Sequence, residues 1–213
     1  MTPETGGFWS PVALSADLPA GTVMPAWMPA GSVALWRSRS GKLAAWMDRC
    51  PHRGMRLSHG FVRGEALSCI YHGWSYSREG TCLRIPAHPG LTPPPTIRAT
   101  AYKVEERDGV IWVAAEQTDE RPPGLEGLVP LRSMTMLAGV DSVEAAAGGA
   151  LDARNILASN GVNLLLARQE EAQTLVHILI DPAAKLYERI AASRAGEALR
   201  RAAELHSGQG AVA

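Results

Sequence analysis

The sequence predicts a mainly β protein. An antiparallel β sandwich or barrel is expected over residues 8–117, followed by a small α+β segment over residues 134–213 with a β-hairpin and a long helix. Short apolar stretches separated by Gly- and Pro-containing turns predict the first part. A helical apolar stripe near the end of the chain predicts the second. Between them the composition becomes polar and Pro-rich, so residues 118–133 are predicted to be a linker.

Paired apolar stretches predict the strands of the first part. Ser32–Arg37 and Lys42–Met47 flank a short Ser- and Gly-containing loop, and this pattern is typical of a hairpin. Asp17–Gly21 predicts a turn, and the Pro-rich stretch 86–95 predicts irregular backbone. The other expected strands are Trp9–Leu14, Phe61–Arg63, Ala66–Ser68, Trp74–Ser77, Thr81–Ile85, Ala101–Glu105 and Val110–Ala114.

The second part is predicted to mix helix and strand. Residues 142–160 are Ala-rich and are expected to be helical in part. Val162–Ala167 and Thr174–Ile180 predict two strands that pair as a hairpin.

A long amphipathic helix is predicted at the end of the chain. Asp181 suits a helix N-cap and Pro182 the first helical position, so the helix is expected to run from there to about Leu205. Gly196 lies inside this stretch and argues against an unbroken helix, because glycine weakens a helix interior.

Composition and charge argue against several classes of protein. Hydrophobic residues make up 46% of the 213 residues and charged residues 20%, which is ordinary for a globular chain. The formal net charge of +0 gives no indication of nucleic-acid binding, and no apolar run approaches the roughly 20 residues of a membrane span. No export signal is expected from the N-terminal residues, and three cysteines are too few for a disulfide framework. A cytoplasmic location is therefore expected.

Two short stretches each combine one Cys with one His. Cys50-Pro51-His52 and Cys69-Ile70-Tyr71-His72 are separated by the sixteen residues 53–68. Two thiolates and two imidazoles are the ligands of a Rieske [2Fe–2S] cluster, in which two Cys bind one iron and two His bind the other. Gly54 and Gly73 follow the His residues closely and allow the backbone to bend around such a cluster.

Two other interpretations use the same side chains. A structural zinc site is built from the same Cys and His atoms. Aromatic cover from Tyr71, Trp74 and Tyr76 favours the iron–sulfur cluster over zinc. A lone Cys or His usually packs or faces solvent, and that is the expectation for the remaining Cys82 and for the loop residues His59 and His88.

A family resemblance rests on Asp48–Gly54, Cys69–Tyr76 and Arg84–Ala87. Through these stretches, residues 8 to about 116 resemble the N-terminal Rieske domain of ring-hydroxylating and demethylating Rieske oxygenases. The resemblance implies that Cys50 and Cys69 bind one iron, and that His52 and His72 bind the redox-active iron.

The resemblance also separates two kinds of Rieske protein. Respiratory and photosynthetic members carry a second Cys in each loop, where this chain has Met55 and Tyr71, and a Ser donor where this chain has Trp74. The difference implies a reduction potential near the lower end of the Rieske range of about −150 to +300 mV. Such a potential suits electrons from a reductase or ferredoxin.

A full oxygenase of this family adds a mononuclear iron site with two His and a carboxylate. Downstream of the linker only His177 and His206 remain, on a predicted strand and near a helix end, which is not the expected pair. Mononuclear iron is therefore not expected in this chain. Residues 134–213 resemble the end of the oxygenase catalytic domain without its iron-binding middle.

Three functions remain open, and none names a substrate. The first is electron transfer from a reductase or ferredoxin to mononuclear iron in a partner subunit, within the trimer-based oligomer that the resemblance implies. The second is a self-contained oxygenase with an atypical iron site. Its candidate ligands are His177, His206, Asp141, Asp152 and Glu171. The third is a non-catalytic redox sensor. Whether the chain is itself an enzyme stays open.

Overall fold

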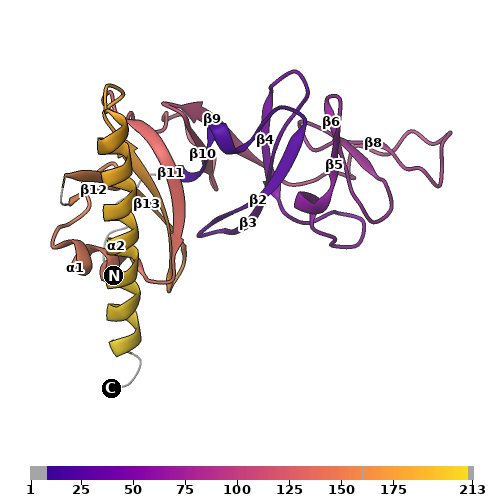
Figure 1. Ribbon diagram of the computed structural model, residues 1–213. Helices are drawn as coiled ribbons and strands as arrows, with labels where there is room; N and C mark the ends of the chain where they lie inside the picture. The colour runs from indigo at the N-terminus through magenta and orange to yellow at the C-terminus, as the bar shows by residue number, and fades with distance from the viewer. Residues whose placement is uncertain (1–8, 160, 211–213) are drawn as a thin grey trace. The chain divides into compact units, whose positions relative to one another are not determined.

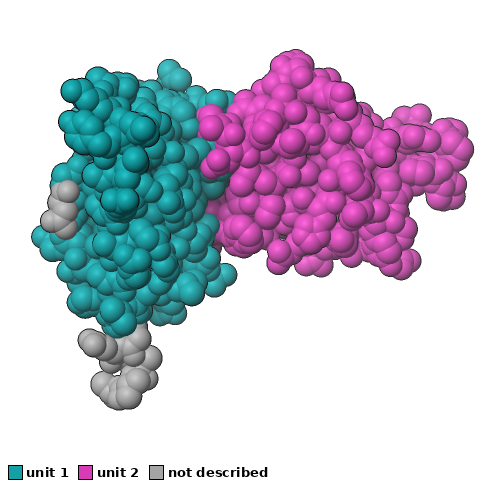
Figure 2. Space-filling model, in the orientation of Figure 1, with its two compact units in different colours: residues 1–14, 106–112, 120–213 teal, residues 15–105, 113–119 magenta. Residues whose placement is uncertain are grey.

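The computed structural model describes residues 9–159 and 161–210, and it confirms the mainly β prediction. The described strands form one sheet of six strands and two sheets of four (Figure 1). Packing divides the chain into two units (Figure 2). The N-terminal unit comprises residues 15–105 and 113–119, and the C-terminal unit comprises residues 1–14, 106–112 and 120–213. Packing thus groups 106–112 with the C-terminal unit, although the predicted first domain ran through 117.

The six-stranded sheet has the order β1-β10-β9-β4-β3-β2. Its strands are β1 (Trp9–Leu14), β2 (Thr22–Met28), β3 (Gly31–Arg37), β4 (Leu43–Met47), β9 (Ala101–Arg107) and β10 (Val110–Ala114). β2 was not predicted, because Pro25 within it reads as a strand breaker. The sheet accommodates Pro25 because β2 is an edge strand, where a missing N–H donor need not break a ladder.

A small sheet with the order β5-β6-β7-β8 holds the second Cys/His stretch. Its strands are β5 (Phe61–Arg63), β6 (Ala66–Ser68), β7 (Ser75–Ser77) and β8 (Cys82–Arg84). Ser68 pairs with Ser75, so Cys69–Trp74 forms the loop of the β6–β7 hairpin. The first Cys/His stretch begins three residues after the end of β4, at Cys50. Trp36, Trp46, Leu67 and Tyr76 are completely buried beneath the two loops and fix the strands that carry them.

The C-terminal unit contains a four-stranded antiparallel sheet with the order β11-β14-β13-β12. Its strands are β11 (Val129–Met136), β12 (Ile156–Ser159), β13 (Val162–Glu170) and β14 (Gln173–Ile180). The predicted hairpin is therefore confirmed as β13–β14, but it is the centre of a larger sheet. Two expectations were wrong in part. β11 begins inside the predicted linker 118–133. In the stretch 142–160, which was expected to be partly helical, α1 (Val140–Ala147) provides the helix and β12 is a strand.

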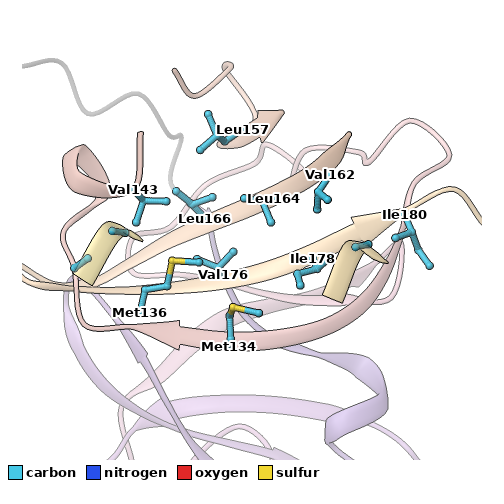
Figure 3. Packing of buried hydrophobic residues seen from close by; sticks show 13 residues of the cluster. Met134, Met136, Val143, Leu157, Val162, Leu164, Leu166, Val176, Ile178 and Ile180 are labelled. Atoms are coloured by element: carbon cyan, nitrogen blue, oxygen red, sulfur yellow. The ribbon is translucent and has the colours of Figure 1, made fainter. Parts of the chain in front are cut away.

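The last helix, α2 (Leu186–Gly210), runs along one face of this sheet (Figure 1). The predicted start at Asp181 was wrong, because the Asp181 carboxylate instead accepts a hydrogen bond from the Ala183 N–H in a turn before the helix (2.7 Å). Gly196 does not interrupt α2. A Cβ there would lie 2.5 Å from Ile178 Cδ1, so glycine permits the helix to approach the sheet closely. Figure 3 shows Met134, Met136 and Ile178 in the resulting core.

Within the described residues, no helix combines the length and apolar content needed to cross a membrane.

Candidate metal centre

The two Cys/His loops have the same backbone hydrogen bonds. In the first, the Cys50 N–H donates to the Met55 carbonyl (2.8 Å) and the Gly54 N–H to the Cys50 carbonyl (2.8 Å). In the second, the Cys69 N–H donates to the Trp74 carbonyl (2.9 Å) and the Gly73 N–H to the Cys69 carbonyl (3.0 Å). In each loop the fourth residue after the Cys has a left-handed backbone conformation, which glycine adopts without strain. The φ angle is 73° at Gly54 and 69° at Gly73.

The two thiols lie deepest in the candidate site. Cys50 and Cys69 are each only 3% exposed. Burial raises the pKa of the Cys69 thiol, and the neighbouring Cys50 raises it further, whereas backbone N–H groups of Tyr71 and His72 lower it. N–H groups directed at a sulfur stabilise its negative form. The loop therefore has donors suited to a metal-bound thiolate, which is the form of Cys that binds iron.

The two imidazoles lie outside the thiols. His52 is half-buried and His72 exposed, and their ring centroids are 4.6 Å apart. Trp74 stacks on His52 with ring centroids 4.2 Å apart and planes 7° from parallel. Burial lowers the pKa of His52, and the nearby His72 and Arg53 lower it further. A lowered pKa favours the neutral imidazole, which is the form that binds a metal.

Two buried thiols and two outer imidazoles on matching loops fit the donor set of a [2Fe–2S] cluster with mixed ligation. A scan against known families matches the Rieske [2Fe-2S] domain over residues 8–97. Residues 8–97 are a Rieske domain. The match confirms the expected Rieske domain and the expected cofactor, a Rieske-type [2Fe–2S] cluster.

Curated relatives match the Rieske domain but extend well beyond it. Oxidoreductase NdmD of Pseudomonas putida is 37% identical over 117 residues, 54% of this chain and 19% of that protein. The oxygenase subunit of 3-chlorobenzoate-3,4-dioxygenase from Comamonas testosteroni is 36% identical over 108 residues, 50% of this chain and 25% of that protein. The chain thus spans about a fifth to a quarter of the length of these relatives.

Solved structures extend the likeness to most of the chain. Dicamba monooxygenase bound to dicamba matches with a TM-score of 0.74 at 17% identity, covering 95% of this chain and 87% of that chain. The demethylase NdmA of Pseudomonas putida matches with a TM-score of 0.66 at 19% identity, covering 92% and 79%. At this level of identity the likeness establishes a shared fold.

No three His, Cys, Asp or Glu side chains converge on a single ion within the part of the chain that the structure describes. A Rieske cluster does not need such a group, because each of its irons has only two protein ligands. A structural zinc ion needs four ligands at one point.

The other candidate iron ligands are not brought together. His177 is fully buried and hydrogen-bonded through Nδ1 to Ser133 Oγ (2.8 Å) and through Nε2 to the Pro11 carbonyl (3.2 Å). His206 is exposed on α2, where its Nδ1 lies 2.8 Å from the Ala202 carbonyl. Both side chains therefore have structural hydrogen bonds in place of a shared metal site.

Sequence patterns missed one group that supports the first loop of the Rieske domain. Asp48 is 4% exposed, and its two carboxylate oxygens accept hydrogen bonds from the N–H (2.7 Å) and hydroxyl (2.6 Å) of Ser58. The pair ties the residues before Cys50 to the short helix η2 (Leu57–His59). No local pattern relates these positions, because their contact depends on the folded loop.

The remaining Cys and His residues lie where the sequence predicted. Cys82 is buried on β8, opposite Tyr76 in the adjacent strand. His59 and His88 are exposed. None of the three is placed to extend the candidate donor set.

Proposed function

We propose that this chain is an electron-transfer component of a Rieske oxygenase system. It accepts single electrons from a reductase or ferredoxin and passes them to a mononuclear iron oxygenase site in a partner subunit. The single observation that carries the proposal is the pair of matching loops, with thiols inside and imidazoles outside. In this proposal Cys50 and Cys69 bind the inner iron, and His52 and His72 bind the outer iron. The bound cluster supplies reversible one-electron redox chemistry.

The protein groups around the loops have separate roles in this proposal. The Tyr71 and His72 N–H groups stabilise the buried thiolate of Cys69. The Trp74 ring covers one face of His52 and limits its contact with water. The imidazoles lie at the surface, so electrons leave and enter where a partner protein can approach closely.

The relatives support redox partners in general terms. Their names include an oxidoreductase, a demethylase and a dioxygenase subunit. We propose a reductase or ferredoxin as donor, and a neighbouring subunit in a trimer-based oligomer as acceptor. The proposal names no substrate class, because the chain covers only 19–25% of the length of these proteins.

The test is to assemble the purified chain with iron and sulfide under anaerobic conditions and to measure metal content and EPR spectra. We expect about two irons and two sulfides per chain, and a low average g after reduction with dithionite, as mixed His/Cys ligation requires. Cys69→Ser should abolish the cluster, whereas Cys82→Ser should retain it. Zinc in place of iron would contradict the cluster assignment. Substrate turnover by the isolated chain with reductase and oxygen would contradict transfer to a partner subunit.

A further inference from the structure

Uncompensated positive charge lies beside the first Cys/His loop. A pocket of about 490 Å³ is lined by Arg49, Arg53 and Arg98 together with Cys50 and His52. None of the three arginines forms an ion pair among the described residues. The Arg98 guanidinium donates only to the backbone carbonyl of Glu79 (3.0 Å). The pocket therefore presents charged donors next to the half-buried imidazole.

The net charge of +0 conceals a division between the two units. The N-terminal unit contains eleven Lys and Arg against seven Asp and Glu, whereas the C-terminal unit contains ten against fourteen. Asp48, the acidic residue closest in sequence to the pocket, is buried and hydrogen-bonded to Ser58. Its charge is therefore not presented at the surface. The field outside the first loop is positive, and it attracts groups of negative charge.

Apolar side chains are exposed at the end of β4 and on the second Cys/His loop. Met47, which also lines the pocket, is 40% exposed, and Ile70 and Tyr71 of the second loop are 47% and 60% exposed. Apolar contacts surrounded by charged groups are typical of protein–protein interfaces. A small anion would need only the arginines, so this combination favours a macromolecular partner.

We propose that the arginine-lined pocket and the exposed apolar side chains form the docking surface for an acidic electron-donor protein. Asp or Glu carboxylates of the donor pair with Arg49, Arg53 and Arg98, because guanidinium groups bind carboxylates in bidentate geometry. This places the donor against His52. Each encounter transfers one electron: the donor is oxidised by one electron, this chain is reduced by one, and no covalent bond forms or breaks. The inference rests on the proposed function.

The test uses the cluster-containing chain with a plant-type [2Fe–2S] ferredoxin as the acidic probe. Calorimetry measures the Kd of the oxidised ferredoxin, which involves no electron transfer. Stopped-flow spectroscopy measures the second-order rate constant of reduction by the reduced ferredoxin. We expect that rate constant to fall about tenfold as ionic strength rises from about 0.02 to about 0.3 M. Arg53→Glu and Arg98→Glu should each weaken binding and slow reduction at low salt by about fivefold or more.

Arg39→Glu is the matched control. It makes the same change of charge in the same unit, but it lies on the loop joining β3 and β4, at the opposite end of β4 from Met47. It should leave the Kd and the rate constant within about twofold of the unchanged chain. An equal effect of Arg39→Glu, or a rate that does not respond to salt, would overturn the docking surface.

Two further measurements separate docking from cluster assembly. Full reduction by excess dithionite, with the same iron content and EPR signal as the unchanged chain, shows that each variant retains its cluster. If Arg53→Glu loses its cluster, Arg98→Gln is the second variant, because Arg98 is farther in sequence from the proposed ligands. Arg98→Gln should also weaken ferredoxin binding. A cluster that dithionite reduces normally, with ferredoxin binding indifferent to Arg98, would overturn the docking surface alone. A chain that binds no cluster would overturn the proposed function as well.

Discussion

The hydroxyl of Tyr76 lies 3.1 Å from Cys50 Sγ, and the ring is completely buried. Burial raises the pKa of the Tyr76 phenol above its usual value, so the hydroxyl stays protonated. A ligating thiolate carries no proton, and the hydroxyl is then the donor. Hydrogen bonds to cluster sulfurs raise the reduction potential.

Replacing Tyr76 with Phe should therefore lower the reduction potential. Loss of one hydrogen bond worth about 0.5–1.5 kcal/mol corresponds to about 20–60 mV for a one-electron couple. A redox titration followed by EPR measures the shift. Tyr102→Phe is the control, since Tyr102 is a half-buried tyrosine on β9 paired with Ala45. An unchanged potential in Tyr76→Phe would contradict a donor role for this hydroxyl.

His177 predicts a pH dependence of folding stability. Burial lowers the pKa of His177 to about 4, from an ordinary value near 6.5. The unfolded chain therefore binds a proton between these values and the folded chain does not, so stability is present above pH 6.5 and falls as the pH drops towards 4. The shift corresponds to about 3 kcal/mol of unfolding free energy.

Urea unfolding at a series of pH values checks this dependence. The expected result is that His177→Gln loses much less stability between pH 7 and pH 5 than the unchanged chain. His59→Gln, at an exposed histidine of the N-terminal unit, should keep the original dependence. Parallel curves for the chain and His177→Gln would show that His177 does not carry the effect.

Sequence reasoning identifies the residues of the candidate site where the pattern is local. Cys50 and His52 are two positions apart, and Cys69 and His72 are three apart, so each pair can be recognised without knowledge of the fold. The Asp48–Ser58 pair joins positions ten residues apart through a contact that exists only after folding. For the same reason, the sequence did not reveal the structural hydrogen bonds of His177.

At the scale of elements, short-range pairing was predicted and long-range pairing was not. β3–β4 and β13–β14 are hairpins whose strands are adjacent in the sequence. β11 pairs with β14 instead, and the two strands are separated by α1, β12 and β13. A partner so distant leaves no periodic pattern between the strands. The sequence therefore predicted a hairpin where the chain forms a four-stranded sheet.

Gly196 provides a prediction about the packing of α2. Alanine stabilises a helix interior by about 1 kcal/mol relative to glycine. The added Cβ would lie 2.5 Å from Ile178 Cδ1 and 3.2 Å from Met134 Cε, and overpacking typically costs about 1–3 kcal/mol. Gly196→Ala should therefore lower the unfolding free energy by about 1 kcal/mol, measured by urea denaturation.

A double-mutant cycle isolates the steric cause. Ile178→Val removes the Cδ1 atom that the new Cβ would meet, so Gly196→Ala should destabilise the Ile178→Val background less than the unchanged chain. An equal loss in both backgrounds would show that the close contact with Ile178 is not responsible.

At the scale of the whole molecule, the four proposed ligands all belong to the N-terminal unit, between residues 50 and 72. The two units have separate buried clusters. One lies around Trp36, Trp46 and Tyr76, and the other around Met136, Leu164 and Ile178. A metal centre that binds only the folded state stabilises the region that contains its ligands. Its removal should therefore affect the two clusters unequally.

Hydrogen exchange of the chain with and without its cluster tests this difference. Removing the cluster should speed exchange of the β6 and β7 amides by about tenfold or more, because both strands end at the Cys69 loop. Amides of β13 and β14, which form the centre of the other sheet, should change by less than about twofold and serve as the internal control. Equal acceleration in both sheets would mean that the molecule opens as one cooperative unit, since local opening would then cost as much as global unfolding.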